Sequence, residues 1–353
     1  MALFRKKATP LLGVDISSTA VKVVELSRQG GRYRVESYAV EPLPQNAVVE
    51  KNITDMDAVT KALQSAVKRS RTKLREAAVA VPGSSAISRV LTLSGGLSES
   101  DIEAQVGLQA EQYVPFPLSE VNLDFQVLGP ARHGSGDEID VLLVASRSEN
   151  VELRVDVLEA AGIKPRVVDV ESFAVEHACD LMAPERGNGD NKVIAVMDIG
   201  ATMSTLTVLE NDRIGYTRDQ VFGGRQLTEE IMRRYGMSWE EAGRAKRRGG
   251  LPDDYEPEVL APFREAMAQQ VARSLQFFYG AGQHSGVDAV LLAGGCANVP
   301  GAAAEIEEAA GIPTRIANPC AEMATASRVR AEELNEDAPA MLIACGLAMR
   351  SFD

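Results

Sequence analysis

Two short segments of the chain have the residue types that bind phosphate groups. The first begins at Asp15, which ends an apolar run, and continues with small polar residues and a lysine: Ser17, Ser18, Thr19 and Lys22. Such a turn presents backbone N–H groups to phosphate oxygens, and the lysine adds positive charge near the terminal phosphates. Because aspartate and serine also fill many ordinary hairpin turns, this segment alone is a weak indication of a nucleotide site.

The second segment repeats this arrangement in the other half of the chain. Asp198 follows an apolar run at 193–197 and precedes a small-residue turn made of Gly200, Ala201 and Thr202. Glycine in such a turn lets the backbone approach a phosphate closely. Two turns of this kind, facing each other, would clamp the β- and γ-phosphates, with Asp15 and Asp198 holding hydrated Mg²⁺ between them. The pair of motifs therefore predicts a magnesium nucleotide site.

A third candidate element is a pair of glycines near the C-terminal end of the chain. Gly294 and Gly295 come directly after the apolar residues 290–293. Two glycines at a strand end would let the backbone pass close to a bound nucleotide. A Gly-Gly pair after a strand is in most cases only a turn, so this element by itself identifies no ligand.

The composition limits the other functions that this chain can have. A formal net charge of -13 and a pI near 4.9 argue against a large contact with nucleic acid or with an anionic membrane. No run of about 18 apolar residues is present, so we expect any membrane association to come through a partner.

The cysteines and histidines are too scattered for a zinc site: Cys179, Cys296, Cys320, Cys345, His133, His177 and His284. With a polar start and no signal peptide, the thiols are expected to be reduced, which indicates a cytoplasmic protein.

The hydrophobic pattern predicts the elements that position the first turn. Residues 11–14, 21–26 and 33–40 read as three strands joined by turns. Apolar residues recur at helical spacing over 57–68, and 77–81 follows as a buried strand.

A segment with a different pattern of strands and helices follows at 84–146. It contains strand patterns and one helix, which begins at Ser98 with a capping box to Asp101 and stops before Pro115. The strands are expected at 87–93, 121–128 and 139–145, with a hairpin loop at 132–138. We interpret this segment as a small subdomain inserted into the first half.

The remaining elements complete two similar halves. We expect helices at 149–161 and 172–182, the latter capped by Ser172, a strand at 166–170 and a polar linker at 184–191. The second half has a strand at 289–292 and helices at 226–235, 238–246, 258–280 and 343–349.

Both halves begin with a strand, an aspartate, a small-residue turn and a returning strand, so the chain is predicted to be an α/β protein with two related lobes. The predicted divisions are 10–86 with 149–190 for the core of lobe 1, 87–148 for the insert, 191–222 with 283–353 for the core of lobe 2, and 223–282 for its second subdomain.

In the order of these motifs the sequence resembles the superfamily of actin, sugar kinases and heat-shock-chaperone ATPases. The resemblance implies a first phosphate loop at 15–22, a second at 198–202 and an adenosine loop at 294–298 that ends at Asn298. It also implies that Gly223 and Gly224 lie near the nucleotide and that Lys246 reaches the ribose. For Lys246, a solvated helix face is the plain alternative.

Within that superfamily the chain is similar to the PilM family, the branch that shares a relocated subdomain with FtsA. The similarity rests on an ordered set of segments: LGVDISS at 12–18, VPGSS at 81–85, EQYVPFP at 111–117 and VDVESFA at 168–174. It implies a two-lobed actin-like ATPase fold with an FtsA/PilM-type insert in the first lobe, and ATP and Mg²⁺ as ligands.

Two departures from the superfamily pattern bear on activity. Ser17 stands where actin relatives usually have glycine, which places a Cβ in the phosphate turn. Glu171 falls where relatives place the residue that orients the attacking water, and a carboxylate there is a candidate general base. Glu171 can equally serve only to favour the start of the helix that follows. ATP binding with weak or no hydrolysis is therefore the expectation.

The PilM resemblance implies a cytoplasmic component of the type IV pilus assembly platform, held at the inner membrane through the N-terminal segment of PilN, which binds in a groove involving the insert. Other platform proteins, motor ATPases and further copies of the chain are additional candidate partners. The alternatives are a metabolic kinase, for which no acceptor site is readable, and an FtsA-like filament former. FtsA proteins typically end in an amphipathic membrane helix, whereas this sequence ends at Asp353 without one.

Overall fold

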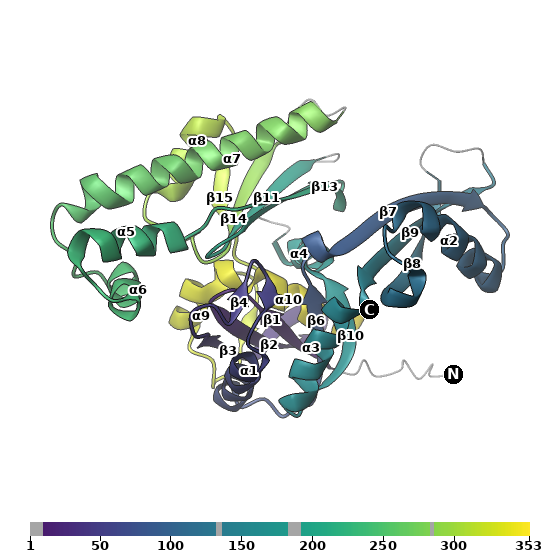
Figure 1. The fold of residues 1–353 in the computed structure, drawn as a ribbon, viewed down its shortest axis with the longest axis horizontal. Coiled ribbons are helices and arrows are strands. Elements are labelled where there is room, and N and C mark those ends of the chain that lie inside the picture. The colour runs from purple at the N-terminus through teal and green to yellow at the C-terminus, as the bar shows by residue number, and fades with distance from the viewer. Residues whose placement is uncertain (1–9, 132–135, 183–191, 283–285) are drawn as a thin grey trace.

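The computed structural model describes residues 10–131, 136–182, 192–282 and 286–353. Two large sheets form two lobes that face each other, and a smaller unit stands to one side, at the right of Figure 1. In the described part of the chain, no helix combines the length and apolarity that crossing a bilayer requires.

The sheet of lobe 1 has six strands in the order β10-β6-β1-β2-β3-β16. In chain order these are β1 (Leu12–Ile16), β2 (Ala20–Gln29), β3 (Arg32–Pro42), β6 (Glu76–Val81), β10 (Lys164–Val170) and β16 (Ala324–Thr325). Strand β1 is antiparallel to β2 and parallel to β6. It is buried along its whole length, as expected for a central strand covered on both faces.

The sheet of lobe 2 repeats this topology with five strands in the order β13-β12-β11-β14-β15. The strands are β11 (Val193–Ile199), β12 (Ser204–Glu210), β13 (Arg213–Gln220), β14 (Ala289–Ala293) and β15 (Thr314–Ile316). Strand β11 is antiparallel to β12 and parallel to β14, so it holds in lobe 2 the place that β1 holds in lobe 1. The two similar halves predicted from the sequence are present.

Helices cover both faces of each sheet. On the outer face of lobe 1, α1 (Met56–Ser70) and α3 (Ser148–Ala160) pack on a core with the central strands. On the outer face of lobe 2 lie α7 (Ala261–Ala281) and α8 (Ala302–Ala310), as Figure 1 shows. Between the sheets, α4 (Glu171–Cys179) and α10 (Leu342–Met349) share a core with residues of β6, β11 and β14. The shared core joins the two lobes.

The other helices of the lobes are α5 (Arg225–Tyr235), α6 (Trp239–Arg248) and α9 (Ala331–Asp337). The helix expected over 258–280 is a π-helical turn, Glu256–Leu260, followed by α7.

The insert is a three-stranded antiparallel sheet with one helix. Its strands are β7 (Ala86–Ser94), β8 (Val121–Pro130) and β9 (Glu138–Arg147), in the order β7-β9-β8. Helix α2 (Glu99–Tyr113) packs against one face of this sheet through Ile102, Val106 and Ala110. The capping box of Ser98 with Asp101 is present, as predicted. The hairpin loop expected at 132–138 lies partly outside the described residues.

Two expectations need correction. Ser172 does not cap the helix that follows β10: α4 begins one residue earlier, at Glu171, and its N-cap Val170 offers no side-chain hydrogen bond. A short hairpin of β4 (Val48–Val49) and β5 (Asn52–Ile53) was not expected, because strands of two residues carry no periodic pattern. The linker predicted at 184–191 lies outside the described residues, and the domain boundaries stay a prediction.

Candidate nucleotide site between the lobes

The two predicted phosphate turns meet across the lobes. The hydroxyl oxygens of Ser18 and Thr202 lie 3.0 Å apart, although the residues are 184 positions apart in the chain. Asp15 and Asp198 are each the second-last residue of the matching strands β1 and β11. Since β1 and β11 both end at the turns that touch, the two carboxylates lie in the same part of the structure.

Lys22 is paired with Asp15 rather than standing alone. The two residues are cross-strand partners in β1 and β2, and the lysine Nζ lies 2.7 Å from the aspartate Oδ2. Burial opposes the charged ammonium, but attraction by Asp15, Asp198 and Glu171 outweighs it, so the pKa of Lys22 is above its ordinary value. Lys22 therefore remains a cation at the base of the first turn.

Asp198 lies in surroundings that disfavour its negative charge. Burial raises the pKa of Asp198, while Lys51 and Lys22 oppose this rise and the carboxylates of Asp15 and Asp219 add to it. A divalent cation placed between Asp15 and Asp198 would relieve this repulsion. Carboxylate oxygens are ligands that Mg²⁺ prefers, so the residues present fit the metal that the sequence predicts.

Glycines bring three loops into close contact around the second turn. The N–H of Gly224 donates to the carbonyl of Gly200 over 3.0 Å, and a Cβ at Gly223 would stand 2.5 Å from the carbonyl oxygen of Ala201. Gly294 has a φ of +85°, and a Cβ there would stand 2.3 Å from Oδ1 of Asp198. Any other residue at Gly223 or Gly294 would push these loops apart.

Other predicted site residues make contacts that the sequence did not indicate. Lys246 donates from Nζ to the Gly224 carbonyl over 3.1 Å and to Oγ1 of Thr228 over 2.9 Å. Burial lowers the pKa of Lys246. The lysine thus lies on the glycine loop of lobe 2, and its contact with a ribose stays a prediction.

The loop predicted to contact adenosine and the first turn both contain exposed residues. Asn298 is exposed and donates from Nδ2 to the carbonyl of Glu336 over 2.6 Å, while Gly295 has open space where a Cβ would stand. In the first turn, Thr19 is exposed, and Ser17 donates from Oγ to the Ala20 carbonyl over 2.9 Å. The serine that replaces a glycine therefore tightens its own turn.

Glu171 is buried at the first position of α4. Its Oε2 accepts a hydrogen bond from Nζ of Lys51 over 2.6 Å. Burial raises the pKa of Glu171, Lys51 opposes the rise, and Asp15 and Asp198 add to it. Glu171, Lys51, Asp198 and Thr205 line one narrow pocket between the lobes. Because its pKa is raised, the ionised carboxylate of Glu171 is more basic than that of an ordinary glutamate, as a general base requires.

Lys51 lines this pocket and was not among the residues predicted from the sequence. It lies on the turn between β4 and β5, and it has a φ of +66°. The residue pair Glu50-Lys51 carries no signal for a tight turn, which normally has asparagine or glycine at such positions. No local pattern could therefore have identified it.

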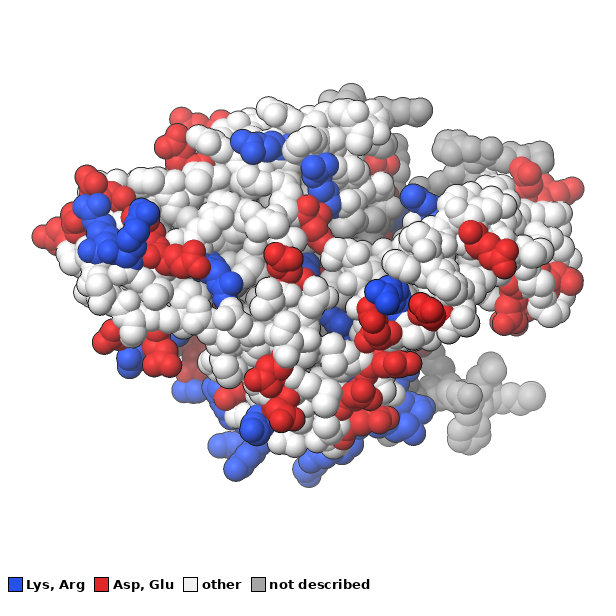
Figure 2. All heavy atoms as spheres, in the orientation of Figure 1, with Lys and Arg blue, Asp and Glu red and all other residues white. Residues whose placement is uncertain are grey.

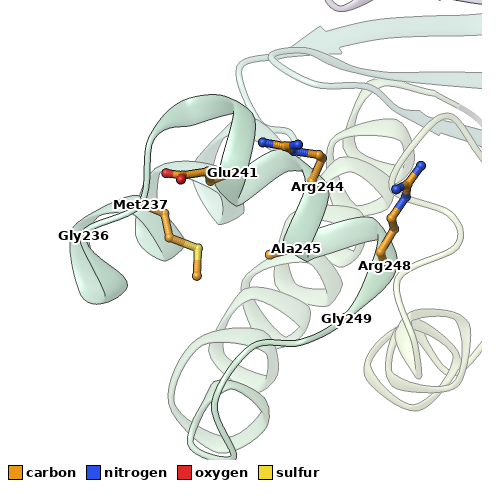
Figure 3. Close-up of a pocket in the computed structure, with 7 residues that line it drawn as sticks. All are labelled: Gly236, Met237, Glu241, Arg244, Ala245, Arg248 and Gly249. Atoms are coloured by element: carbon orange, nitrogen blue, oxygen red, sulfur yellow. The ribbon is translucent and has the colours of Figure 1, made fainter.

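A wider, open pocket lies at the outer side of α6 and contains none of the predicted site residues. Figure 3 shows that Arg244 and Arg248 extend from the same stretch of α6, while Met237 comes from the turn before the helix. Helical spacing places Lys246 on the other face of α6. None of the residues predicted to bind the nucleotide therefore belongs to this pocket.

Comparison with known proteins identifies the family. The family described as type IV pilus assembly protein PilM matches residues 13–352. The chain belongs to the PilM family. A solved PilM-PilN type IV pilus biogenesis complex contains a chain that is 28% identical, with a TM-score of 0.81, over 98% of this chain and 99% of that chain.

Other relatives support the same fold. The ethanolamine utilization protein EutJ of Escherichia coli (strain K12) is 30% identical over 151 residues, which are 43% of this chain and 47% of EutJ. The cell division protein FtsA of Bacillus subtilis (strain 168) is 24% identical over 260 residues, 68% of this chain and 57% of FtsA. The chain thus spans about half the length of these curated relatives.

The structure of EutJ from Carboxydothermus hydrogenoformans is 16% identical with a TM-score of 0.57, over 98% of this chain and 93% of that chain. The predicted two-lobed actin-like ATPase fold of the PilM family is confirmed.

Proposed function

We propose that this chain binds ATP with Mg²⁺ in the cleft between its lobes and serves in type IV pilus assembly by holding the N-terminal cytoplasmic segment of PilN. The observation that carries the nucleotide half of the proposal is the contact between Ser18 and Thr202. It brings both phosphate turns to one place. Asp15 and Asp198 would hold the metal, which would neutralise the phosphates, and Gly223, Gly224 and Gly294 would let the backbone approach the nucleotide.

The insert supports the partner half of the proposal. Its sheet has a helix on one face only, and the insert exposes Val90 on β7, Leu108 on α2 and Val127 on β8. Residues 87–148 contain nine acidic residues against three arginines, and Figure 2 shows acidic side chains over this unit at the right of the view. Exposed apolar residues together with an excess of acidic side chains suit a peptide that carries both apolar and basic side chains.

This proposal places the protein in the cytoplasm, at the inner membrane only through PilN. Other platform proteins, motor ATPases and additional copies of the chain remain candidate partners, and nucleic acid is not among them. We also propose that hydrolysis is weak or absent, with Glu171 as the candidate base.

One pair of titrations tests both halves of the proposal. ATP is titrated into the purified protein with and without Mg²⁺, and a synthetic PilN N-terminal peptide is titrated separately. Saturable binding in both is expected, and ATP affinity should fall when Mg²⁺ is removed. A protein that binds neither ligand would contradict the proposal, and phosphorylation of small alcohols would favour a kinase instead.

A further inference from the structure

The two lobes differ at one matching position of their duplicated strands. In lobe 1, Asp15 on β1 has Lys22 of β2 as its cross-strand partner. In lobe 2, Asp198 on β11 has Thr205 of β12 as its cross-strand partner. Cross-strand partners lie side by side on one face of a sheet. The aspartate of lobe 1 therefore has its own lysine, whereas the aspartate of lobe 2 has a hydroxyl.

Lys51 of lobe 1 brings an ammonium to this position of lobe 2. Its Nζ donates to Oγ1 of Thr205 over 3.0 Å and to Oε2 of Glu171 over 2.6 Å. Thr205 in turn donates to Oδ1 of Asp219 on β13 over 2.6 Å. One lysine thus links a carboxylate of its own lobe to a hydroxyl and a carboxylate of the other lobe.

The backbone around Lys51 is held in place by its surroundings. Glu50 and Lys51 have φ values of 48° and 66°, a left-handed conformation that is unfavourable for residues with side chains. The buried guanidinium of Arg154 donates to the Lys51 carbonyl over 3.0 Å and to the Ala80 carbonyl over 2.6 Å. This anchoring fixes the hairpin tip and directs the lysine into the cleft.

The charges around Lys51 explain why it remains an ammonium. Burial opposes its charge, but Glu171, Asp219 and Asp198 outweigh the burial, so the pKa of Lys51 is well above its ordinary value. Glu171 depends on this cation, because burial and the neighbouring Asp15 and Asp198 all favour its neutral form.

We propose that Lys51 is a positioning residue that fixes the carboxylate of Glu171 and, through its hydrogen bond with Thr205, ties that carboxylate to lobe 2. The role of Glu171 in this inference rests on the proposed nucleotide site. The link itself is a property of the protein alone, and it can be measured without nucleotide.

Hydrogen exchange of the full chain tests the link between the lobes. Lys51→Met should raise amide exchange in β12 and β13, across the cleft, by about tenfold, the change expected when a charge-assisted hydrogen bond is lost. Thr205→Val should raise exchange in β4 and β5 of lobe 1 by a similar factor. The double variant should show less than the product of the two single effects, because both substitutions remove the Lys51–Thr205 hydrogen bond. Lys61→Met, on the exposed side of α1, is the matched control.

The outcomes separate the inference from the proposed function. Exchange changes confined to the lobe that carries each substitution, or effects that multiply in the double variant, would overturn the link. Lys51→Arg retains the cation and should restore most of the protection. If Lys51→Met fails to fold, Thr205→Val still tests the cross-lobe effect.

ATP binding is measured on the same samples. Lys51→Met should weaken ATP affinity about tenfold if the link holds the lobes closed on the nucleotide. A wild-type protein that does not bind ATP would refute the proposed function, while the exchange result would still decide whether Lys51 links the lobes.

Discussion

Ser18 and Thr202 touch across the cleft, with their hydroxyl oxygens 3.0 Å apart. Each residue lies in the turn that follows the central strand of its own lobe. The contact places the two turns side by side, with Asp15 and Asp198 on the strands that precede them. The effects expected at Asp198 and Gly294 depend on this relationship.

Neutralising Asp198 should remove the metal dependence of nucleotide binding. Asp198→Asn is expected to lower ATP affinity at least about tenfold in Mg²⁺ and to make the remaining affinity insensitive to Mg²⁺, because a metal ligand is lost. Isothermal titration with and without Mg²⁺ measures both effects. Glu308→Gln, which removes an exposed charge from α8, is the control and should bind ATP as the wild type does. Equal Mg²⁺ dependence in Asp198→Asn and wild type would rule out the metal site.

The same substitution should change how stability depends on pH. Burial raises the pKa of Asp198 above 3.8, so the folded state binds more protons than the unfolded state between 3.8 and the folded pKa. Stability from this group is therefore present below that window and is lost as the pH rises through it. Without Mg²⁺ at neutral pH, Asp198→Asn should raise the melting temperature by about 1–2 °C, roughly the shift that 1 kcal/mol causes in a chain of this length.

Thermal unfolding from pH 4 to pH 8 measures this difference. The gap between variant and wild type should shrink toward pH 4. A gap that grows toward low pH would mean that the charge of Asp198 is stabilised by its surroundings, contrary to this account.

Adding a methyl group at Gly294 should disrupt the site and the fold around it. Gly294→Ala combines a φ of +85° with a Cβ placed 2.3 Å from Oδ1 of Asp198. We expect a loss of about 1–3 kcal/mol of unfolding free energy from the backbone conformation, together with weaker ATP binding. Urea unfolding and ATP titration give the two values. Gly280→Ala on α7, where a Cβ meets no atom within 4 Å, should leave ATP binding unchanged and should not lower the unfolding free energy, because alanine favours a helix over glycine by up to about 1 kcal/mol.

A charge on the open face of the insert should weaken PilN binding and spare the nucleotide site. Val90 is 56% exposed and pairs with Leu142 across β7 and β9. Val90→Asp should lower the affinity for a PilN N-terminal peptide about tenfold or more, because an added carboxylate would be desolvated in the complex. Fluorescence anisotropy with labelled peptide measures this.

The control places the same charge on lobe 2. Val221 is 72% exposed, and Val221→Asp should leave peptide affinity unchanged. Equal losses in both variants would indicate a general charge effect and not a site on the insert.

Local patterns were sufficient to predict much of the fold. The strand–aspartate–turn pattern at Asp15 and Asp198 predicted the duplicated halves, and the capping box of Ser98 with Asp101 predicted the start of α2. These succeed because turn chemistry and capping act between residues a few positions apart. The cap expected at Ser172 was wrong because Glu171, held by Lys51, already belongs to the first turn of α4.

By itself, the sequence determined the two lobes, the insert and the places of both small-residue turns, because strand periodicity and turn composition depend only on residues close together in the chain. Only the tertiary structure decided that Ser18 meets Thr202 and that Lys51 meets Glu171, 120 positions away, and Thr205, 154 positions away. Such contacts depend on how packed sheets and helices bring distant segments together. A two-residue strand and a strained turn gave no sign of them in advance.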